Sequence, residues 1–204
     1  MLGYVFWHAA PSISATAEYE KRLLHFGRAL ANAKIPGLLG NASYTISQTP
    51  WLGEPGYEDW AWLESSRALD ALNERAVSGA MEQPHDAIAQ MTKHGGFGAL
   101  YYLVAGDHKI PGDSKVMWLS RPRGINWRDI MPVILKSANS EVAVWRRQMV
   151  LGPSTEFAVI GPPNLTLTVP EGWKYLQVDR HRLRQHQLSE RLPRRAKNQP
   201  PSRR

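Results

Sequence analysis

The order of strand-like and helix-like segments constrains the fold of this chain more than any other sequence feature. A run rich in β-formers, GYVFWHA at 3–9, precedes a segment at 16–34 in which apolar residues recur every three or four positions. The same patterns then predict strands at 38–48 and 57–64, two helical segments at 65–79 and 84–94, and a strand at 97–106. With the two consecutive helical segments counted as one helical connection, the first half of the chain follows the order β-α-β-β-α-β.

This order is that of the split βαβ, or ferredoxin-like, unit. After a linker at 108–114 the pattern begins again, with strands predicted at 115–121, 141–151, 156–161 and 173–180 and one helix at 126–137. We therefore expect an α+β fold of two tandem ferredoxin-like units, 1–107 and 115–180, the second of which lacks a helix.

Length and composition narrow the function classes. The chain has 204 residues, which is enough to bury a sizeable core. The absence of cysteine excludes a disulfide framework, a thiolate metal site and a cysteine nucleophile. No run approaches the roughly 18 apolar residues of a membrane span, and the N-terminus lacks the basic start of a signal peptide. We therefore expect a cytoplasmic protein with no transmembrane segment.

Positive charge is concentrated at the C-terminus. Residues 180–204 carry eight Arg and one Lys against one Glu, a net charge of +8, whereas residues 1–179 carry a net charge of −1. The segment 181–204 has few apolar residues, so we expect a basic disordered tail. Such a tail binds nucleic acid or anionic lipid weakly, or it serves only as a solubilising extension. It has no aromatic residue to stack on bases, and both interpretations stay open.

Aromatic residues are the best clue to a site. Strand alternation places Trp60 and Trp62 on one face with two glutamates, and it places Tyr4, Phe6 and His8 on one face of the first strand. Trp145 shares a face with Arg147 and Met149 in the same way. Faces that mix aromatic with charged side chains are typical of a barrel lining that holds a planar apolar ligand. The alternative is that these rings are ordinary core residues. The predicted ligand-binding residues are Tyr4, Phe6, Trp60, Trp62 and Trp145.

Two residues are candidates for catalysis. His8 lies at the end of the first strand and can act as a general base near neutral pH. Arg147 would orient the substrate through its charge, unless Glu58 or Glu64 pairs with it inside the protein. His8 can equally be an ordinary hydrogen-bonded residue. The sequence has no phosphate loop, no nucleophile elbow and no metal-binding spacing, so we expect no metal site.

Several stretches resemble a known superfamily. GYVFWH at 3–8, GYEDWAWLE at 56–64, ALDALNERAVSG at 68–79, PHDAIA at 84–89 and WRRQMVLGPSTEF at 145–157 resemble the dimeric α+β barrel proteins, within an uncharacterised bacterial group that carries two units in one chain. The resemblance implies that the two sheets close face to face into one barrel. Relatives in this superfamily include antibiotic-biosynthesis-type monooxygenases, stress-responsive barrel proteins and chlorite-dismutase-like haem proteins. The haem relatives carry an axial histidine in the second unit, whereas this chain has none between Asn126 and Arg180. We therefore expect no haem and no other cofactor.

Three functions remain open on this basis. The first is a non-catalytic barrel that binds a small aromatic or apolar ligand or forms a homodimer. The second is a cofactor-independent enzyme, similar to a monooxygenase or an isomerase, that acts on an aromatic or polyketide-like compound. The third is binding of nucleic acid or an anionic surface through the basic tail.

Overall fold

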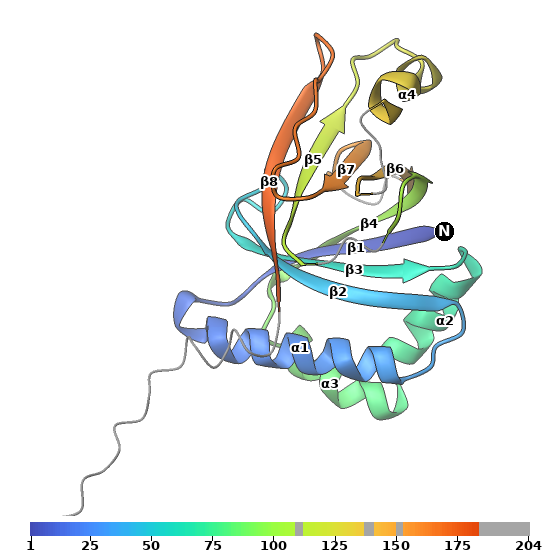
Figure 1. Ribbon diagram of the computed structural model, residues 1–204. Helices are drawn as coiled ribbons and strands as arrows, with labels where there is room; N and C mark the ends of the chain where they lie inside the picture. The colour runs from blue at the N-terminus through green and yellow to red at the C-terminus, as the bar shows by residue number, and fades with distance from the viewer. Residues whose placement is uncertain (109–111, 137–140, 150–152, 184–204) are drawn as a thin grey trace, which may run out of the picture.

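The computed structural model describes residues 1–108, 112–136, 141–149 and 153–183. Eight antiparallel strands close into a barrel in the order β1-β3-β2-β8-β5-β7-β6-β4 (Figure 1). The strands are β1 (Leu2–Ala9), β2 (Leu38–Ile46), β3 (Gly56–Leu63), β4 (Lys93–Ala105), β5 (Ser114–Ser120), β6 (Ala143–Met149), β7 (Phe157–Gly161) and β8 (Lys174–Arg182). Within these ranges the helices are α1 (Thr16–Asn32), α2 (Arg67–Ala76), α3 (Glu82–Ala89) and α4 (Trp127–Leu135).

The barrel is built from two halves with the same internal strand order. The first four strands run β4-β1-β3-β2 across one half, and the last four run β8-β5-β7-β6 across the other. Within each half, the strands numbered along the chain therefore lie in the spatial order fourth, first, third, second. This is the ferredoxin-like order, and it confirms the expected α+β fold of two tandem units fused into one barrel.

The two halves are joined by seams of unequal length. Strand β4 pairs with β6 over five residue pairs, from Leu100 opposite Met149 to Ala105 opposite Val144. The second seam joins β2 to β8 through three pairs, which involve Tyr44–Ile46 and Arg180–Arg182. Residues 181–183 were expected to begin the tail, but His181 and Arg182 complete β8 and Leu183 is buried directly after it. The remainder of the predicted tail, 184–204, lies outside the described residues.

Helices cover the outside of the two halves unequally (Figure 1). Helices α1, α2 and α3 lie against the first sheet, as apolar residues from α1 and α2 cluster with Leu2, Ala61 and Leu63 of that sheet. The second sheet carries α4 and the segment 162–173, whose Leu165 and Trp173 pack against Phe157 and Val159. Leu, Thr and Val alternate at 165–169, but the segment forms no strand and covers the sheet as an irregular stretch.

Two boundaries differ from the sequence pattern. Strand β4 begins at Lys93 and includes Gly95 and Gly96, which the sequence predicts to end a helix. The Phe6 ring lies against Gly96 so closely that a Cβ there would be 2.0 Å from it, which only glycine permits. Helix α3 begins at Glu82, so Pro84 lies at its third residue rather than its first.

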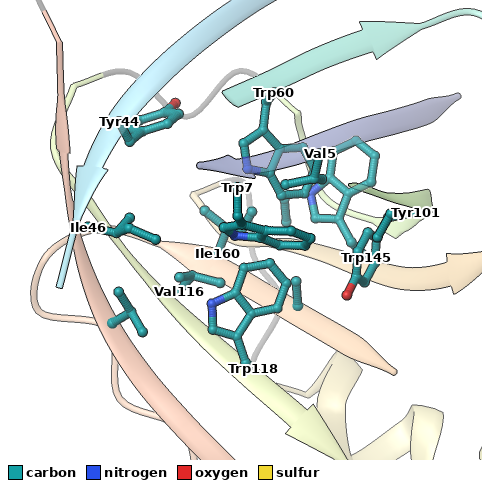
Figure 2. Close-up of a cluster of buried hydrophobic side chains, with 14 of the residues drawn as sticks. Val5, Trp7, Tyr44, Ile46, Trp60, Tyr101, Val116, Trp118, Trp145 and Ile160 are labelled. Atoms are coloured by element: carbon teal, nitrogen blue, oxygen red, sulfur yellow. The ribbon is translucent and has the colours of Figure 1, made fainter. Parts of the chain in front are cut away.

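The barrel interior is filled by aromatic side chains. Trp7, Trp60, Trp118 and Trp145 are all at most 1% exposed, and Figure 2 shows them converging with Tyr101 from different strands. Their ring centroids lie 5.1–6.2 Å apart where they touch. No helix in the described part of the chain is long and apolar enough to cross a membrane.

Candidate functional site

The predicted barrel lining is a packed core in the structure. Trp60, Trp62 and Trp145 point into the barrel and are at most 8% exposed. Gly3 belongs to the same packing, because a Cβ at this position would lie 2.6 Å from the Trp60 ring. These side chains occupy the space in which the sequence analysis placed a planar ligand.

A buried ion pair lies among these rings. The Glu58 carboxylate accepts hydrogen bonds from Trp7 Nε1 at 3.0 Å, Trp60 Nε1 at 2.6 Å and Arg180 Nη1 at 2.8 Å. Arg180 also donates to Ser114 Oγ and lies 4.0 Å from the centre of the Tyr44 ring. Both charged side chains are at most 2% exposed. Their many partners compensate for the cost of burying two charges.

Arg147 does not take part in that ion pair, nor does it lie with His8. The partner of Glu58 is Arg180, and Glu64 is exposed. Arg147 is half-buried on β6 and donates to the carbonyl oxygen of Ser154. The structure therefore separates the two residues that the sequence analysis proposed as catalytic.

Tyr4, Phe6 and His8 lie on the opposite side of the first sheet, under the helices. They line a cavity of about 430 Å³ between β1, β2 and β3 on one side and α1, α2 and α3 on the other. Apolar side chains form most of its wall: Leu23, Phe26, Leu30, Leu72, Ala76 and Ile88. The polar residues on it include Asn41, Ser43, Asp59, Asn73, His85 and Thr92.

His8 is the buried centre of the polar end of this cavity. Its side chain is 2% exposed and stacks between Phe6 and Tyr57, with ring centroids at 5.5 and 5.4 Å. Ring atom Nε2 lies 2.9 Å from Asp59 Oδ2, and Nδ1 lies 2.5 Å from the Tyr19 hydroxyl. The register explains the first contact, because Phe6 pairs with Asp59 and His8 with Tyr57 across β1 and β3.

The hydrogen bonds continue beyond Tyr19. Its hydroxyl lies 3.0 Å from Thr92 Oγ1, which in turn donates to the carbonyl oxygen of Ile88 at 3.1 Å. When both His8 nitrogens carry protons, donors run in one direction from His8 through Tyr19 and Thr92 to that carbonyl. When His8 is neutral, the carboxylate holds the proton on Nε2, and the Tyr19 hydroxyl turns to donate to Nδ1. Rotation of hydroxyl groups is thus enough to accommodate both states of His8.

Asp59 is the functional candidate that the sequence analysis missed. The carboxylate lines the cavity, its side chain is 25% exposed, and its Oδ1 atom is buried without a hydrogen-bond partner among the described residues. The signal was present in the alternation of β3, where Asp59 interrupts the helix-facing row formed by Tyr57, Ala61 and Leu63. Only the pairing of distant strands brings this carboxylate to His8.

The tyrosines beside this pair are held in their neutral form. Burial raises the pKa of Tyr19 far above its ordinary value of 10.0; the hydrogen bond with Thr92 offsets part of this rise, and the Asp59 carboxylate adds to it. Burial and then Asp59 also raise the pKa of Tyr4. The site therefore presents one carboxylate, one imidazole and two phenols that remain protonated. This set can hold a proton and pass it on.

The residues do not fit a haem group. The outer layer of the second half packs Met117, Met131, Phe157 and Trp173 into an apolar cluster, and among the described residues it offers no imidazole. In the first half both nitrogens of His8 are occupied by protein partners. His85 is one-third exposed beside Asp86 and provides no buried axial ligand. Across the described ranges, no three His, Asp or Glu side chains gather as a metal-binding group would.

Solved structures with a similar fold are known. A candidate monooxygenase from Fusobacterium nucleatum is 11% identical over 90% of this chain and 92% of its own, with a TM-score of 0.63. A haem-binding protein from Thermus thermophilus is 11% identical over 93% and 94% of the two chains, with a TM-score of 0.55. A chlorite dismutase from Candidatus Nitrospira defluvii is 6% identical over 93% of each chain, with a TM-score of 0.52. No family model matches the sequence, and no curated protein matches it.

These likenesses concern the fold. The chain shares the dimeric α+β barrel architecture with these proteins over 90–93% of its length, and each of them is matched over more than nine-tenths of its own chain. At such low identity the chemistry of the site depends on the residues of this chain alone.

Proposed function

We propose that this protein binds a small, mainly apolar ligand in the cavity between the first sheet and helices α1–α3. The observation that carries the proposal is the His8–Asp59 pair at the polar end of that cavity. A volume of about 430 Å³ lies within the range of roughly 300–1,000 Å³ that small-molecule sites occupy. Apolar walls with a few convergent polar groups are the usual composition of such sites.

The proposal moves the ligand from the barrel interior to the helix-covered face. Of the five aromatic residues predicted to bind ligand, Tyr4 and Phe6 keep that role in the proposal, and Trp60 borders the same cavity. Trp60, Trp62 and Trp145 become the core that supports the sheet from behind. The protein would then be a two-unit member of the dimeric α+β barrel superfamily, complete as a barrel within one chain and located in the cytoplasm.

A second function is favoured by the hydrogen-bond chain from Asp59 through His8 to Thr92. A chain that accommodates both states of a buried imidazole is suited to proton transfer. In a cofactor-independent enzyme of the monooxygenase or isomerase type, Asp59 would face the substrate and accept its proton. His8 would be the positioning residue that holds the carboxyl group in place through Nε2. The proton would move from a ligand O–H, N–H or acidic C–H to the carboxylate.

The test is binding of an uncharged ring compound, 2-naphthol, to the full-length protein by isothermal titration calorimetry. We expect saturable binding, and we expect Ala76→Phe to abolish it, because Ala76 lines the cavity and a phenyl ring would fill it. Ala80→Phe is the matched control, since Ala80 is exposed just beyond α2. Equal binding by both variants and the wild type would contradict the proposed site.

The proposed catalytic activity needs a separate measurement. Native mass spectrometry of the purified protein identifies a co-purifying small molecule, and exposure of that molecule to the protein in air or under argon reports turnover. Conversion that disappears in Asp59→Asn while binding persists would support catalysis. Binding without conversion in either atmosphere would leave the protein a binding module.

A further inference from the structure

The permanent charge on the cavity wall is negative. Among the described residues that line it, Asp59 is the one carboxylate, and neither Lys nor Arg is present. The chain as a whole is rich in arginine, so the lack of basic side chains is specific to the cavity wall. A carboxylate or phosphate group on a ligand would therefore meet no permanent cation inside it.

Both histidines on the wall already have an acidic neighbour. His8 Nε2 lies 2.9 Å from Asp59 Oδ2, and His85 Nδ1 lies 3.0 Å from Asp86 Oδ1. Any positive charge that they carry is countered by these carboxylates. They do not supply an uncompensated cation for an anionic ligand.

Several hydrogen-bond donors on the wall are used by the protein. Asn41 Nδ2 donates to the carbonyl oxygen of Gly27 at 2.8 Å, and Thr92 Oγ1 donates to the carbonyl oxygen of Ile88. His8 is engaged at both nitrogens. An acceptor, in contrast, is available: Asp59 Oδ1 is buried and lacks a partner within the described chain. A buried acceptor without a donor carries a desolvation cost that a ligand donor would remove.

We infer that the ligand of this cavity carries a hydrogen-bond donor directed at Asp59 and carries no anionic group. This inference rests on the proposed function and deepens it. Two ligand chemistries share the required feature, a ring hydroxyl and a protonated amine. The rings of Tyr4, Phe6 and Phe26 on the same wall suit both, since an aromatic face packs on an apolar ring and attracts an ammonium group.

The test compares three probes built on one bicyclic ring: 2-naphthol, 2-(aminomethyl)naphthalene and 2-naphthoate. We expect calorimetry on the full-length protein at pH 7.5 to show at least tenfold tighter binding of the hydroxyl or the amine probe than of the carboxylate. The tighter of the first two identifies which donor the site prefers. Binding of 2-naphthoate as tight as the tighter of these two probes would overturn the inference and leave the proposed function intact. Absence of binding by all three would overturn both.

Asp59→Asn provides the second arm. The amide removes the charge, so we expect affinity for the amine probe to fall at least tenfold and the penalty against 2-naphthoate to shrink. Asp70→Asn is the matched control, because Asp70 is exposed on α2 and does not line the cavity. Unchanged affinities for all probes in a folded Asp59→Asn protein would contradict the role of this carboxylate. The wild-type comparison decides the question by itself if this variant fails to fold.

Discussion

Glu58 and Asp59 are neighbours on β3 whose carboxylates serve opposite sides of one sheet. Glu58 lies inside the barrel, fully buried, with Arg180 and two indole N–H groups as its partners. Asp59 lies outside the barrel with His8 and borders the cavity. The strand alternation that separates them assigns one acid to the packing of the barrel and the other to the site.

Removal of Arg180 should destabilise the protein strongly. Arg180→Ala leaves the Glu58 charge buried without its cation, and we expect the free energy of unfolding to fall by about 3–5 kcal/mol. Urea unfolding followed by circular dichroism measures this change. His181→Ala is the matched control, because His181 is exposed on the same strand and its contact is with Asp113. A loss no larger than that of the control would show that the ion pair does not stabilise the barrel.

His8 and Tyr19 should act as a coupled pair. Tyr19→Phe leaves His8 Nδ1 buried without its partner, and His8→Phe leaves the Tyr19 hydroxyl with Thr92 alone among the described residues. We expect each substitution to cost about 1–3 kcal/mol. The double variant removes both polar groups at once and should cost less than the sum of the two single variants. A double-mutant cycle by urea unfolding gives the coupling free energy, which we expect to reach about 1 kcal/mol. Strict additivity would contradict the hydrogen bond between them.

Gly3 should be intolerant of a methyl group. In Gly3→Ala the new Cβ would lie 2.6 Å from Cζ3 of Trp60 and 3.1 Å from Cζ3 of Trp145, so the rings must move. Overpacking of this kind costs about 1–3 kcal/mol. Gly27→Ala is the control, because Gly27 lies on α1 without a positive φ and its new Cβ would be 3.4 Å from the nearest atom, Asn41 Nδ2. A melting temperature of Gly3→Ala as high as that of Gly27→Ala would argue against the tight packing at Gly3.

Alkaline pH should weaken the fold through its buried tyrosines. Burial raises the pKa values of Tyr19 and Tyr101 in the folded protein, whereas in the unfolded chain both tyrosines ionise near 10.0. Above pH 10 the unfolded state therefore binds fewer protons than the folded state, and stability falls as pH rises. Urea unfolding at pH 8 and pH 11 should show a smaller loss for Tyr101→Phe than for the wild type. An equal loss of stability in both proteins would show that ionisable groups other than Tyr101 cause the pH dependence.

The point at which the chain is shortened should decide whether it folds. A chain that ends at Leu183 keeps Arg180 with Glu58, and it keeps Leu183, whose amide donates to Ser43 and whose side chain packs beside Tyr19. We expect this chain to unfold at the same urea concentration as the full-length protein. A chain that ends at Asp179 loses these contacts and should be destabilised by several kcal/mol.

The same shortened chain tests nucleic-acid binding. Salt-dependent binding of duplex DNA by the full chain, absent from the chain ending at Leu183, would assign nucleic-acid binding to residues 184–204.

Much of the fold could be predicted from local sequence patterns. The two-residue period of strands such as Leu2–Ala9 and the helical period of Thr16–Asn32 are local properties, and both elements lie where the pattern predicts them. The strand order followed because short connections permit few arrangements. Boundaries were less accurate where tertiary packing decides, as at Gly96 beneath the Phe6 ring.

The site was harder to predict, because alternation tells which residues share a face but not which face lies inside. Trp60 and Trp62 share the barrel interior with Glu58 as the mixed composition suggested, yet Tyr4, Phe6 and His8 face the helices. Asp59 and Tyr19 become partners of His8 through contacts 51 and 11 residues apart in the chain. A single aspartate in a strand carries no local signal of that encounter.

The unequal cover of the two halves has a consequence for stoichiometry. A barrel assembled from two identical chains must repeat every feature of one half in the other, including its cavity. Here α1, α2 and α3 enclose a cavity over the first sheet, whereas α4, Leu165 and Trp173 pack directly on the second. Because both halves belong to one chain, their sequences can differ, and the second half need not contain the cavity of the first. For the proposed site we therefore expect saturation at one ligand per chain.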